Sequence, residues 1–208
     1  MLLLAGIVAI CYGFVDRPVA IWARGLDPGI VAVFRGVTVL GSFGPYLAGL
    51  AVLYLALRFH LRRPVAAKQS AFVFGAIVLS GLTVDLIKPL VARWRPVALF
   101  ADPARYGFAF FKIGHNHNSF PSGHATTAWA VACALTLLYP RLRVLWFTAA
   151  AAVAASRVIV GAHYPGDVLA GAWFGVVITL ALGRTACFRE ALEAPVNVSR
   201  QAGNRPLA

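Results

Sequence analysis

Acidic side chains are scarce in this chain: its 208 residues include only 7 Asp and Glu, against 19 Lys and Arg. Charged residues of both signs make up 12% of the sequence, whereas a soluble domain carries about 25%. Hydrophobic residues make up 60%, and the mean hydropathy is +0.77. This composition excludes an ordinary soluble enzyme and indicates a membrane protein. The few carboxylates also form no cluster of the kind that coordinates Mg²⁺.

Cysteine is rare as well. Cys11, Cys133 and Cys187 are isolated, each in or beside an apolar stretch. An odd count without CxxC spacing excludes a disulfide framework and a cysteine zinc site. The first fifteen residues, MLLLAGIVAICYGFV, contain no basic leader and no small-residue cleavage site, so we do not expect a secretory signal. Whether the natural start lies upstream stays open.

Long apolar runs predict an all-α fold, a polytopic membrane helix bundle with about six transmembrane helices. The runs cover residues 1–15, 43–58, 70–88, 124–139, 144–162 and 166–183. The first run is short, so it either continues past Asp16-Arg17-Pro18 or begins upstream. We expect 17–42 to hold a short interfacial helix, 1–183 to form a single membrane-embedded domain, and 184–208 to be a poorly ordered cytoplasmic tail.

The excess of basic residues gives a net charge of +12, but they form no stripe suited to nucleic acid, so no nucleic-acid partner is expected. Instead they gather in two short connections, 59–69 and 140–143, with Arg58 at the edge of the first. The positive-inside rule places such loops in the cytoplasm. Both termini are then cytoplasmic, and the segments that face the opposite side of the membrane are 17–42, 89–123 and 157–166.

The first of three polar blocks is Lys88-x6-Arg95-Pro96. Two cations seven residues apart can grip phosphate oxygens, arginine with a planar fork and lysine with a point charge. The alternative is interfacial snorkelling, which is common for basic residues at membrane helix ends. Pro89 and Pro96 predict that the helix ends or kinks near Lys88. We expect Asp85 to neutralise Lys88 or Arg93, because an unpaired carboxylate is costly in a membrane.

The second block, Pro121-Ser122-Gly123-His124, precedes an apolar run. Ser122 suits the N-cap of a helix, and Gly123 lets the backbone approach a ligand closely. The first amides of that helix would attract an anion, and His124 would stand beside it. The alternative is a plain serine-capped helix with an interfacial histidine.

The third block is Ser156-Arg157-x5-His163-x3-Asp167. Pro165 suits the first turn of a helix, which places His163 just before that helix and Asp167 just inside it. A carboxylate bonded to one ring nitrogen would fix the tautomer and leave the other nitrogen free as a nucleophile. Arg157 needs an anionic partner within a membrane. The alternative is a purely structural network.

Two further features lie in the segment 89–123. We interpret His115 and His117 as loop polarity or contacts to a substrate headgroup, because a third metal ligand is missing. Aromatic residues in the same segment suit a lid at the level of the lipid headgroups: Phe100, Tyr106, Phe108, Phe110 and Phe111.

The three blocks resemble the signature motifs of the type 2 phosphatidic acid phosphatase (PAP2) superfamily, which also includes vanadium haloperoxidases. The resemblance covers roughly residues 80–170 and implies a membrane phosphatase that uses no metal or other cofactor. It implies that the phosphate is held by Lys88, Arg95, Arg157, Ser122 and the Gly123 amide. It also implies that His163 attacks phosphorus, that Asp167 orients His163, and that His124 protonates the leaving oxygen.

The expected function is therefore hydrolysis of a lipid phosphomonoester or pyrophosphate through a phosphohistidine, in a bacterial inner membrane with the site on the periplasmic side. Phosphatidic acid, phosphatidylglycerol phosphate, undecaprenyl pyrophosphate and lipid A 1-phosphate are all open as substrates. Two alternatives remain at this point. One is a lipid phosphotransferase that uses the same histidine, and the other is an anion-binding or transport protein without chemistry.

Overall fold

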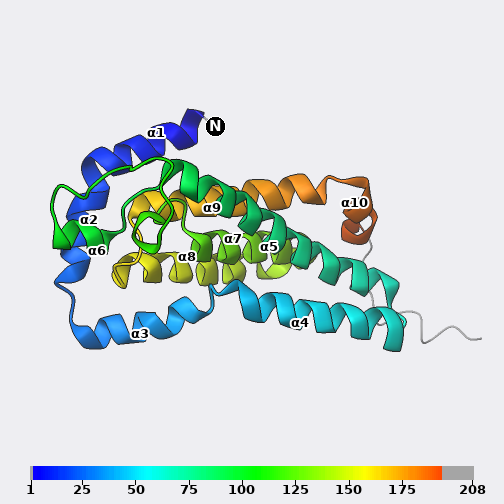
Figure 1. Ribbon diagram of the computed structural model, residues 1–208. Coiled ribbons are helices and arrows are strands. Elements are labelled where there is room, and N and C mark those ends of the chain that lie inside the picture. Colours follow the sequence, from blue (N-terminus) through cyan, green and yellow to red (C-terminus); the bar gives the residue numbers. More distant parts are fainter. Residues whose placement is uncertain (1, 194–208) are drawn as a thin grey trace, which may run out of the picture.

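A computed structural model describes residues 2–193, which fold as helices joined by turns and one long loop (Figure 1). Within this range no strand forms beyond an isolated bridge between Arg93 and Phe108. The α-helices are α1 (Leu2–Ile10), α2 (Asp16–Arg24), α3 (Pro28–Val39), α4 (Phe43–Leu55), α5 (Pro64–Val91), α6 (Pro96–Ala101), α7 (Gly123–Leu138), α8 (Arg143–Ile159), α9 (Pro165–Gly183) and α10 (Ala186–Glu193). Short helical turns are η1 (Cys11–Val15), η2 (Ala56–His60), η3 (His115–His117) and η4 (Pro140–Leu142).

The described residues contain five helices long and apolar enough to cross a membrane. They are Leu2–Arg24, Pro28–His60, Pro64–Val91, Pro140–Ile159 and Pro165–Gly183. Helix α7 is apolar too but shorter, with 16 residues. Together these helices match the predicted all-α membrane bundle with about six spans.

The first span is longer than its apolar run, because α1, η1 and α2 form one helix through Asp16-Arg17-Pro18. The π-helical turn Cys11–Val15 directly before α2 already widens the hydrogen-bond ladder, so the ring of Pro18 fits without ending the helix. Residues 17–24 therefore belong to the first candidate span and α3 belongs to the second, Pro28–His60, so the separate interfacial helix expected within 17–42 is wrong. The polar stretch can stay in the span because Asp16 is buried and paired with Arg93.

Helix α7 lies at the centre of the bundle, in contact with α5, α8 and α9 (Figure 1). Its contact with α9 is close because two glycines of α9 face it. A Cβ at Gly171 would lie 2.5 Å from the Ser122 carbonyl oxygen, and one at Gly175 would lie 2.5 Å from the Thr126 carbonyl oxygen. Small residues spaced four apart let membrane helices pack backbone to backbone. This contact brings the start of α7 beside the start of α9.

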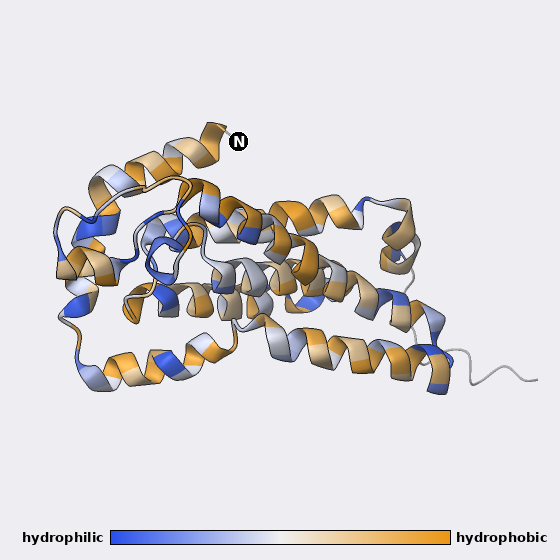
Figure 2. Cartoon of the chain, viewed as in Figure 1, coloured by the Kyte–Doolittle hydropathy of each residue, from blue (hydrophilic) through white to orange (hydrophobic). Residues whose placement is uncertain are grey.

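Hydrophilic residues gather at the two ends of the bundle (Figure 2). The end on the left of the figures holds the loop 92–122 and the turn between α8 and α9. The opposite end holds the turn between α4 and α5 and the turn between α7 and α8. All three polar blocks therefore lie at one end, and the basic connections lie at the other.

The chain beyond α9 is ordered for longer than predicted. Helix α10 packs against α5, with the rings of Phe188 and Phe72 5.4 Å apart and Gln69 donating a hydrogen bond of 3.1 Å to the Ala191 carbonyl. Phe188 and Leu192 are one turn apart and both meet the core cluster of α5 and α7. The expected poorly ordered tail is thus wrong for 186–193, while 194–208 lie outside the described residues.

Candidate active site

The three blocks line one cavity of about 410 Å³. Its polar end is formed by residues from the end of α5, the loop 92–122, the start of α7, the last turn of α8 and the turn that follows it. They are Lys88, Arg95, His115, Gly123, His124, Arg157 and His163. Its other end is apolar and runs between α4 and α5, along Phe43, Leu47, Ile77, Val78, Gly81 and Leu82. The cavity joins a cluster of cations to a slot for an apolar chain.

Lys88 stands in the last turn of α5, which continues through Pro89 to Val91 and ends where Ala92 takes a left-handed conformation. The helix therefore ends near Lys88, as predicted. The Lys88 ammonium lies 2.6 Å from the Asp85 carboxylate, which confirms that Asp85 neutralises it. A Cβ at Gly123 would lie 3.4 Å from this ammonium, so the first and second blocks meet where glycine leaves room.

Helix α7 begins at Gly123 and places Ser122 at the N-cap position, as predicted. The hydroxyl of Ser122, however, makes no capping hydrogen bond, and within residues 2–193 it is buried without a partner. The Ser122 amide instead donates to the Asp167 carbonyl over 3.0 Å, which ties the second block to the third. Ser122 is buried and is not among the residues that line the cavity, so a contact between its hydroxyl and the phosphate stays a prediction.

Two arginines complete the cationic end of the cavity. In the described part of the chain, the Nε atoms of Arg95 and Arg157 are buried without hydrogen-bond partners. Thr38 of α3 accepts a hydrogen bond of 2.6 Å from Arg157 and so fixes its direction. Burial lowers the pKa of Arg95, yet an arginine stays charged in a protein. Buried donors on fixed cations are what a phosphoryl group needs for binding.

The ring of His163 is buried and oriented by the backbone. Its Nδ1 lies 2.7 Å from the carbonyl oxygen of Ser119. Because a carbonyl can only accept, Nδ1 carries the proton and Nε2 keeps its lone pair. Burial lowers the pKa of His163, against the opposing pull of Asp167, and so favours the neutral ring. A neutral ring with a free Nε2 is the form that can act as a nucleophile.

The sequence led us to expect a direct hydrogen bond between Asp167 and His163. The structure does not have it, since the nearer carboxylate oxygen of Asp167 lies 3.8 Å from Nδ1 of His163. That oxygen, Oδ2, accepts from the Ser119 hydroxyl over 2.6 Å and from the Tyr164 amide over 2.9 Å. The other oxygen, Oδ1, accepts from Arg93 over 2.6 Å. With both oxygens occupied, Asp167 reaches the ring through Ser119.

Sequence reasoning missed Ser119, and it assigned Arg93 and Asp16 no role at the site. Arg93 is fully buried between Asp167 and Asp16, 2.6 Å from each. The one available signal was Asp16 itself, an acidic residue next to an apolar run, which is costly in a membrane unless it is paired.

Three of the five residues of the predicted aromatic lid are half-buried and pack against other side chains of the protein. Tyr106 stacks on Tyr12 with centroids 4.9 Å apart, and Phe108 lies 5.3 Å from the same ring. Phe100 lies under the Arg24 guanidinium, at 4.3 Å. Phe110 and Phe111 are exposed, so among the five aromatics these two keep a position suited to a lid.

The two loop histidines are placed differently. His115 lines the cavity, where it can reach a headgroup, whereas the ring of His117 lies 3.9 Å from that of Trp94. Among residues 2–193, no group of three or more His, Cys, Asp or Glu side chains is arranged to hold a metal ion. A metal-free reaction stays a prediction, to be tested by chelation.

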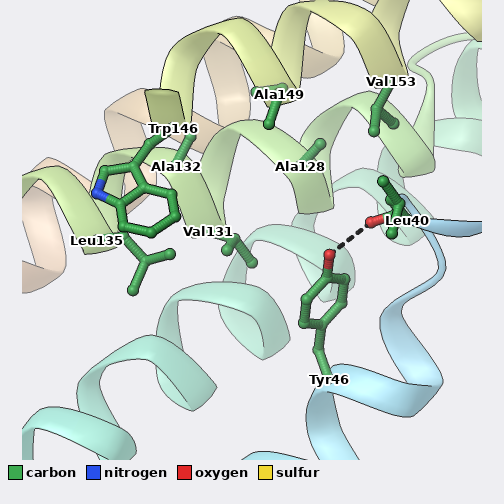
Figure 3. A pocket seen from close by; sticks show the side chains of 10 residues that line it. Leu40, Tyr46, Ala128, Val131, Ala132, Leu135, Trp146, Ala149 and Val153 are labelled. Carbon is green, nitrogen blue, oxygen red and sulfur yellow. Dashed lines mark hydrogen bonds between the residues drawn. The ribbon is translucent and has the colours of Figure 1, made fainter. Parts of the chain in front are cut away.

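A second cavity, of about 240 Å³, lies between the start of α4 and the helices α7 and α8 (Figure 3). Its lining is mostly apolar; the polar side-chain groups are the indole nitrogen of Trp146 and the Tyr46 hydroxyl, which donates to the Leu40 carbonyl over 2.7 Å. It has no cation among its lining residues and is unsuited to a phosphoryl group. The cavity that holds the three blocks is therefore the candidate active site.

Comparisons with known proteins show which family the chain resembles. Residues 69–188 match the model of the PAP2 superfamily. The chain is 43% identical to a lipid A 1-phosphatase of Rhizobium johnstonii over 118 residues. This aligned stretch covers 55% of this chain and 48% of that protein. It is 33% identical over 184 residues to the decaprenylphosphoryl-5-phosphoribose phosphatase of Mycobacterium tuberculosis, 84% of this chain and 85% of that protein. The chain thus spans about half the length of the lipid A 1-phosphatase.

Two crystal structures share the fold. Aquifex aeolicus LpxE superposes with a TM-score of 0.62 at 21% identity, over 82% of this chain and 95% of that one. A phosphatidylglycerolphosphate phosphatase from Bacillus subtilis superposes with a TM-score of 0.57 at 19% identity. The superposition covers 87% of this chain and 92% of that one. At such identities the likeness concerns the helical architecture.

Proposed function

Because the chain belongs to the PAP2 superfamily and is an integral membrane protein, we propose that it is a phosphatase of membrane lipids. It would hydrolyse a lipid phosphomonoester or pyrophosphate through a phosphohistidine on His163. One observation carries this proposal: a single cavity joins three cations and His163 to an apolar slot between α4 and α5. A lipid phosphate has the same division into an anionic head and an apolar chain.

In the first half of the reaction, Lys88, Arg95 and Arg157 hold the phosphoryl oxygens, together with the Ser122 hydroxyl and the Gly123 amide. These fixed donors stabilise the charge that spreads over the oxygens in the transition state. Nε2 of His163 attacks phosphorus while the bond to the lipid oxygen breaks. His124 gives its proton to that oxygen, and the lipid leaves as an alcohol or, from a pyrophosphate, as a monophosphate.

In the second half, His124 takes a proton from water, and the resulting hydroxide attacks the phosphorus bound to His163. The P–N bond breaks, inorganic phosphate forms, and Nε2 regains its lone pair. Throughout, Asp167 keeps Ser119 in place, and the Ser119 carbonyl keeps the proton on Nδ1. The nearby carboxylate also stabilises the positive charge of the phosphorylated ring.

The orientation in the membrane belongs to the same proposal. Arg58, Arg62 and Arg141 lie in connections at the end of the bundle opposite the cavity, and the positive-inside rule assigns that end to the cytoplasm. The active site then faces the periplasm, in a bacterial inner membrane. A single cysteine at Lys112 should react with a membrane-impermeant maleimide in whole cells, and one at Arg62 should not.

The function is tested by measuring phosphate release from the purified protein in detergent with excess EDTA. The panel comprises phosphatidic acid, phosphatidylglycerol phosphate, undecaprenyl pyrophosphate and lipid A. We expect release from at least one lipid, abolished by His163→Ala and retained by His60→Ala, which removes an exposed histidine at the opposite end. Complete loss with EDTA, restored by Mg²⁺ or Zn²⁺, would refute the metal-free reaction. Transfer to an added alcohol in place of water would identify a phosphotransferase.

A further inference from the structure

We infer that Asp16, on the first helix, is a positioning residue for the nucleophile: it holds Arg93, and through Arg93 it fixes Asp167, Ser119 and His163. The inference rests on the proposed function, because it assigns His163 the attack on phosphorus. Asp16 lies outside residues 69–188, which match the PAP2 model. It would make the first helix part of the catalytic apparatus of this chain.

Asp16 uses both carboxylate oxygens. Oδ2 lies 2.6 Å from Nη2 of Arg93, and Oδ1 accepts a hydrogen bond of 2.8 Å from the Gly166 amide. Gly166 precedes Asp167 in the first turn of α9, so Asp16 holds Asp167 from two directions. The approach is close, since a Cβ at Gly166 would lie 3.0 Å from Oδ2 of Asp16.

Arg93 bridges two carboxylates with its two terminal nitrogens, Nη1 to Asp167 and Nη2 to Asp16. All three side chains are 0% exposed. The Arg93 guanidinium carbon lies 4.4 Å from the Tyr164 ring centroid and 5.4 Å from that of Tyr12, so aromatic rings screen the ion pairs from water. Although burial opposes its charge, Asp167 and Asp16 raise the pKa of Arg93. Arg93 therefore stays charged between its two carboxyl partners.

Burying three charges is expensive, and well-packed apolar residues often stabilise a core equally well. The triad is also unsuited to bind the phosphoryl group, since none of its three members lines the cavity and two of them are carboxylates, which would repel an anion. The triad is explained by its place beside the nucleophile, to which Asp167 is connected through Ser119. From Asp167, the Ser119 hydroxyl is 2.6 Å away, and the Ser119 carbonyl accepts from His163 over 2.7 Å.

An unbroken series of short contacts thus runs from Asp16 to the ring that attacks phosphorus. Without Asp16, Arg93 would have one carboxylate in place of two and would draw Asp167 out of its position. Ser119 and the His163 ring would follow, and a reacting group tolerates a displacement of only about 0.5 Å. The cations that hold the anion would stay in place. The loss should fall on bond formation at His163 and spare anion binding.

The test compares two anions in Asp16→Asn and in the wild type. Inorganic phosphate measures binding by the cations, whereas orthovanadate resembles the transition state by bonding to the attacking nitrogen. Asparagine offers one acceptor oxygen where Asp16 uses two, so it cannot serve both Arg93 and Gly166. We expect vanadate inhibition to weaken about 10- to 100-fold and kcat to fall similarly. The inhibition constant of phosphate should be unchanged.

The matched control is Asp27→Asn. Asp27 also accepts from the backbone amides at a helix start, 2.7 Å from Gly29 and 3.4 Å from Ile30, but it is exposed. Asparagine caps helices about as well as aspartate, so inhibition by phosphate and inhibition by vanadate should both be unchanged in Asp27→Asn.

If Asp16→Asn does not fold, Arg93→Lys takes its place. Lysine keeps the positive charge, but its single ammonium lacks the planar fork that spans two carboxylates. The same selective loss of vanadate inhibition is expected. Equal losses for both anions would reveal a purely structural role, and unchanged vanadate inhibition in a folded variant would overturn the inference alone. A wild-type protein that vanadate does not inhibit would overturn the proposed function and this inference with it.

Discussion

His163 and His124 are held in different ways in the cavity, and this difference predicts different effects of their loss. His163 is buried with its Nδ1 proton fixed by Ser119, as a nucleophile requires, whereas His124 lies in the first turn of α7. We expect His163→Ala to abolish turnover of every substrate. His124→Ala should slow hydrolysis of a lipid monoester about 10²- to 10⁴-fold, the usual contribution of a general acid.

An activated ester separates the two roles. The leaving group of p-nitrophenyl phosphate needs little protonation, so His124→Ala should slow its phosphoryl transfer much less than that of the lipid. Single-turnover kinetics with both substrates make the comparison. Substantial turnover by His163→Ala would contradict the assignment. So would an equal loss on both substrates when phosphoryl transfer limits the rate.

Protonation of His163 gives a second prediction. Burial lowers the pKa of His163 below the ordinary value of about 6.5. The ring is neutral above its pKa, so the nucleophile remains available into mildly acidic solution. The Asp167 carboxylate opposes this shift, so Asp167→Asn should lower the pKa further. NMR titration of ¹⁵N-histidine protein, with His163 identified by the signal absent from His163→Ala, measures the pKa directly. A midpoint above about 6.5 would contradict this account.

The contact between α7 and α9 depends on glycine. A Cβ at Gly175 would lie 2.5 Å from the Thr126 carbonyl oxygen and 2.9 Å from the Ala130 amide nitrogen, so Gly175→Ala must separate the helices. Overpacking of this kind costs about 1–3 kcal/mol, and a lower melting temperature in detergent should follow. Gly49→Ala is the control, since nothing lies within 4 Å of its Cβ position in α4. Equal melting of Gly175→Ala and the wild type would show that this contact is not tight.

The slot between α4 and α5 predicts where the lipid chain lies. Gly81 lines the slot and has nothing within 4 Å of a Cβ placed there, so Gly81→Phe would fill space without a backbone clash. Displacing two buried methylenes costs about 1.6 kcal/mol, or roughly tenfold in binding. The KM of Gly81→Phe for a long-chain lipid should therefore rise roughly tenfold, while its KM for p-nitrophenyl phosphate should stay constant. Leu79→Phe, on an exposed part of α5, is the control. Equal KM changes in the two variants would place the chain elsewhere.

Helices and motif positions could be predicted because their signals are local. The apolar runs predicted the spans, and the order Ser122-Gly123 predicted the start of α7. The bounds of the helices were less predictable where contacts between distant segments decide them. Asp16 stays inside a helix because Arg93, 77 residues later, neutralises it. Helix α10 forms where Phe188 meets Phe72. Neither pairing can be read from one segment alone.

The site shows the same limit at finer detail. Spacing correctly brought His163 and Asp167 to the start of one helix, but it could not reveal that Ser119 stands between them. Ser119 stands two residues before the second block and outside it, and its own residue type does not mark it as a link to His163. Its role follows from the path of the loop 92–122, which returns to α9 and presents both a hydroxyl and a carbonyl there.

As a whole, the molecule is a helical bundle that gathers distant residues at one end, around the histidine that we propose accepts the phosphoryl group. The most direct measurement is rapid quenching of the purified protein with a lipid substrate labelled with ³²P in its terminal phosphate. The account predicts a protein-bound label that is stable to alkali, labile to acid and confined to the peptide containing His163. The label should be absent from His163→Ala and should form in excess EDTA. Rapid phosphate release with no labelled protein at any quench time, or a label on another residue, would contradict it.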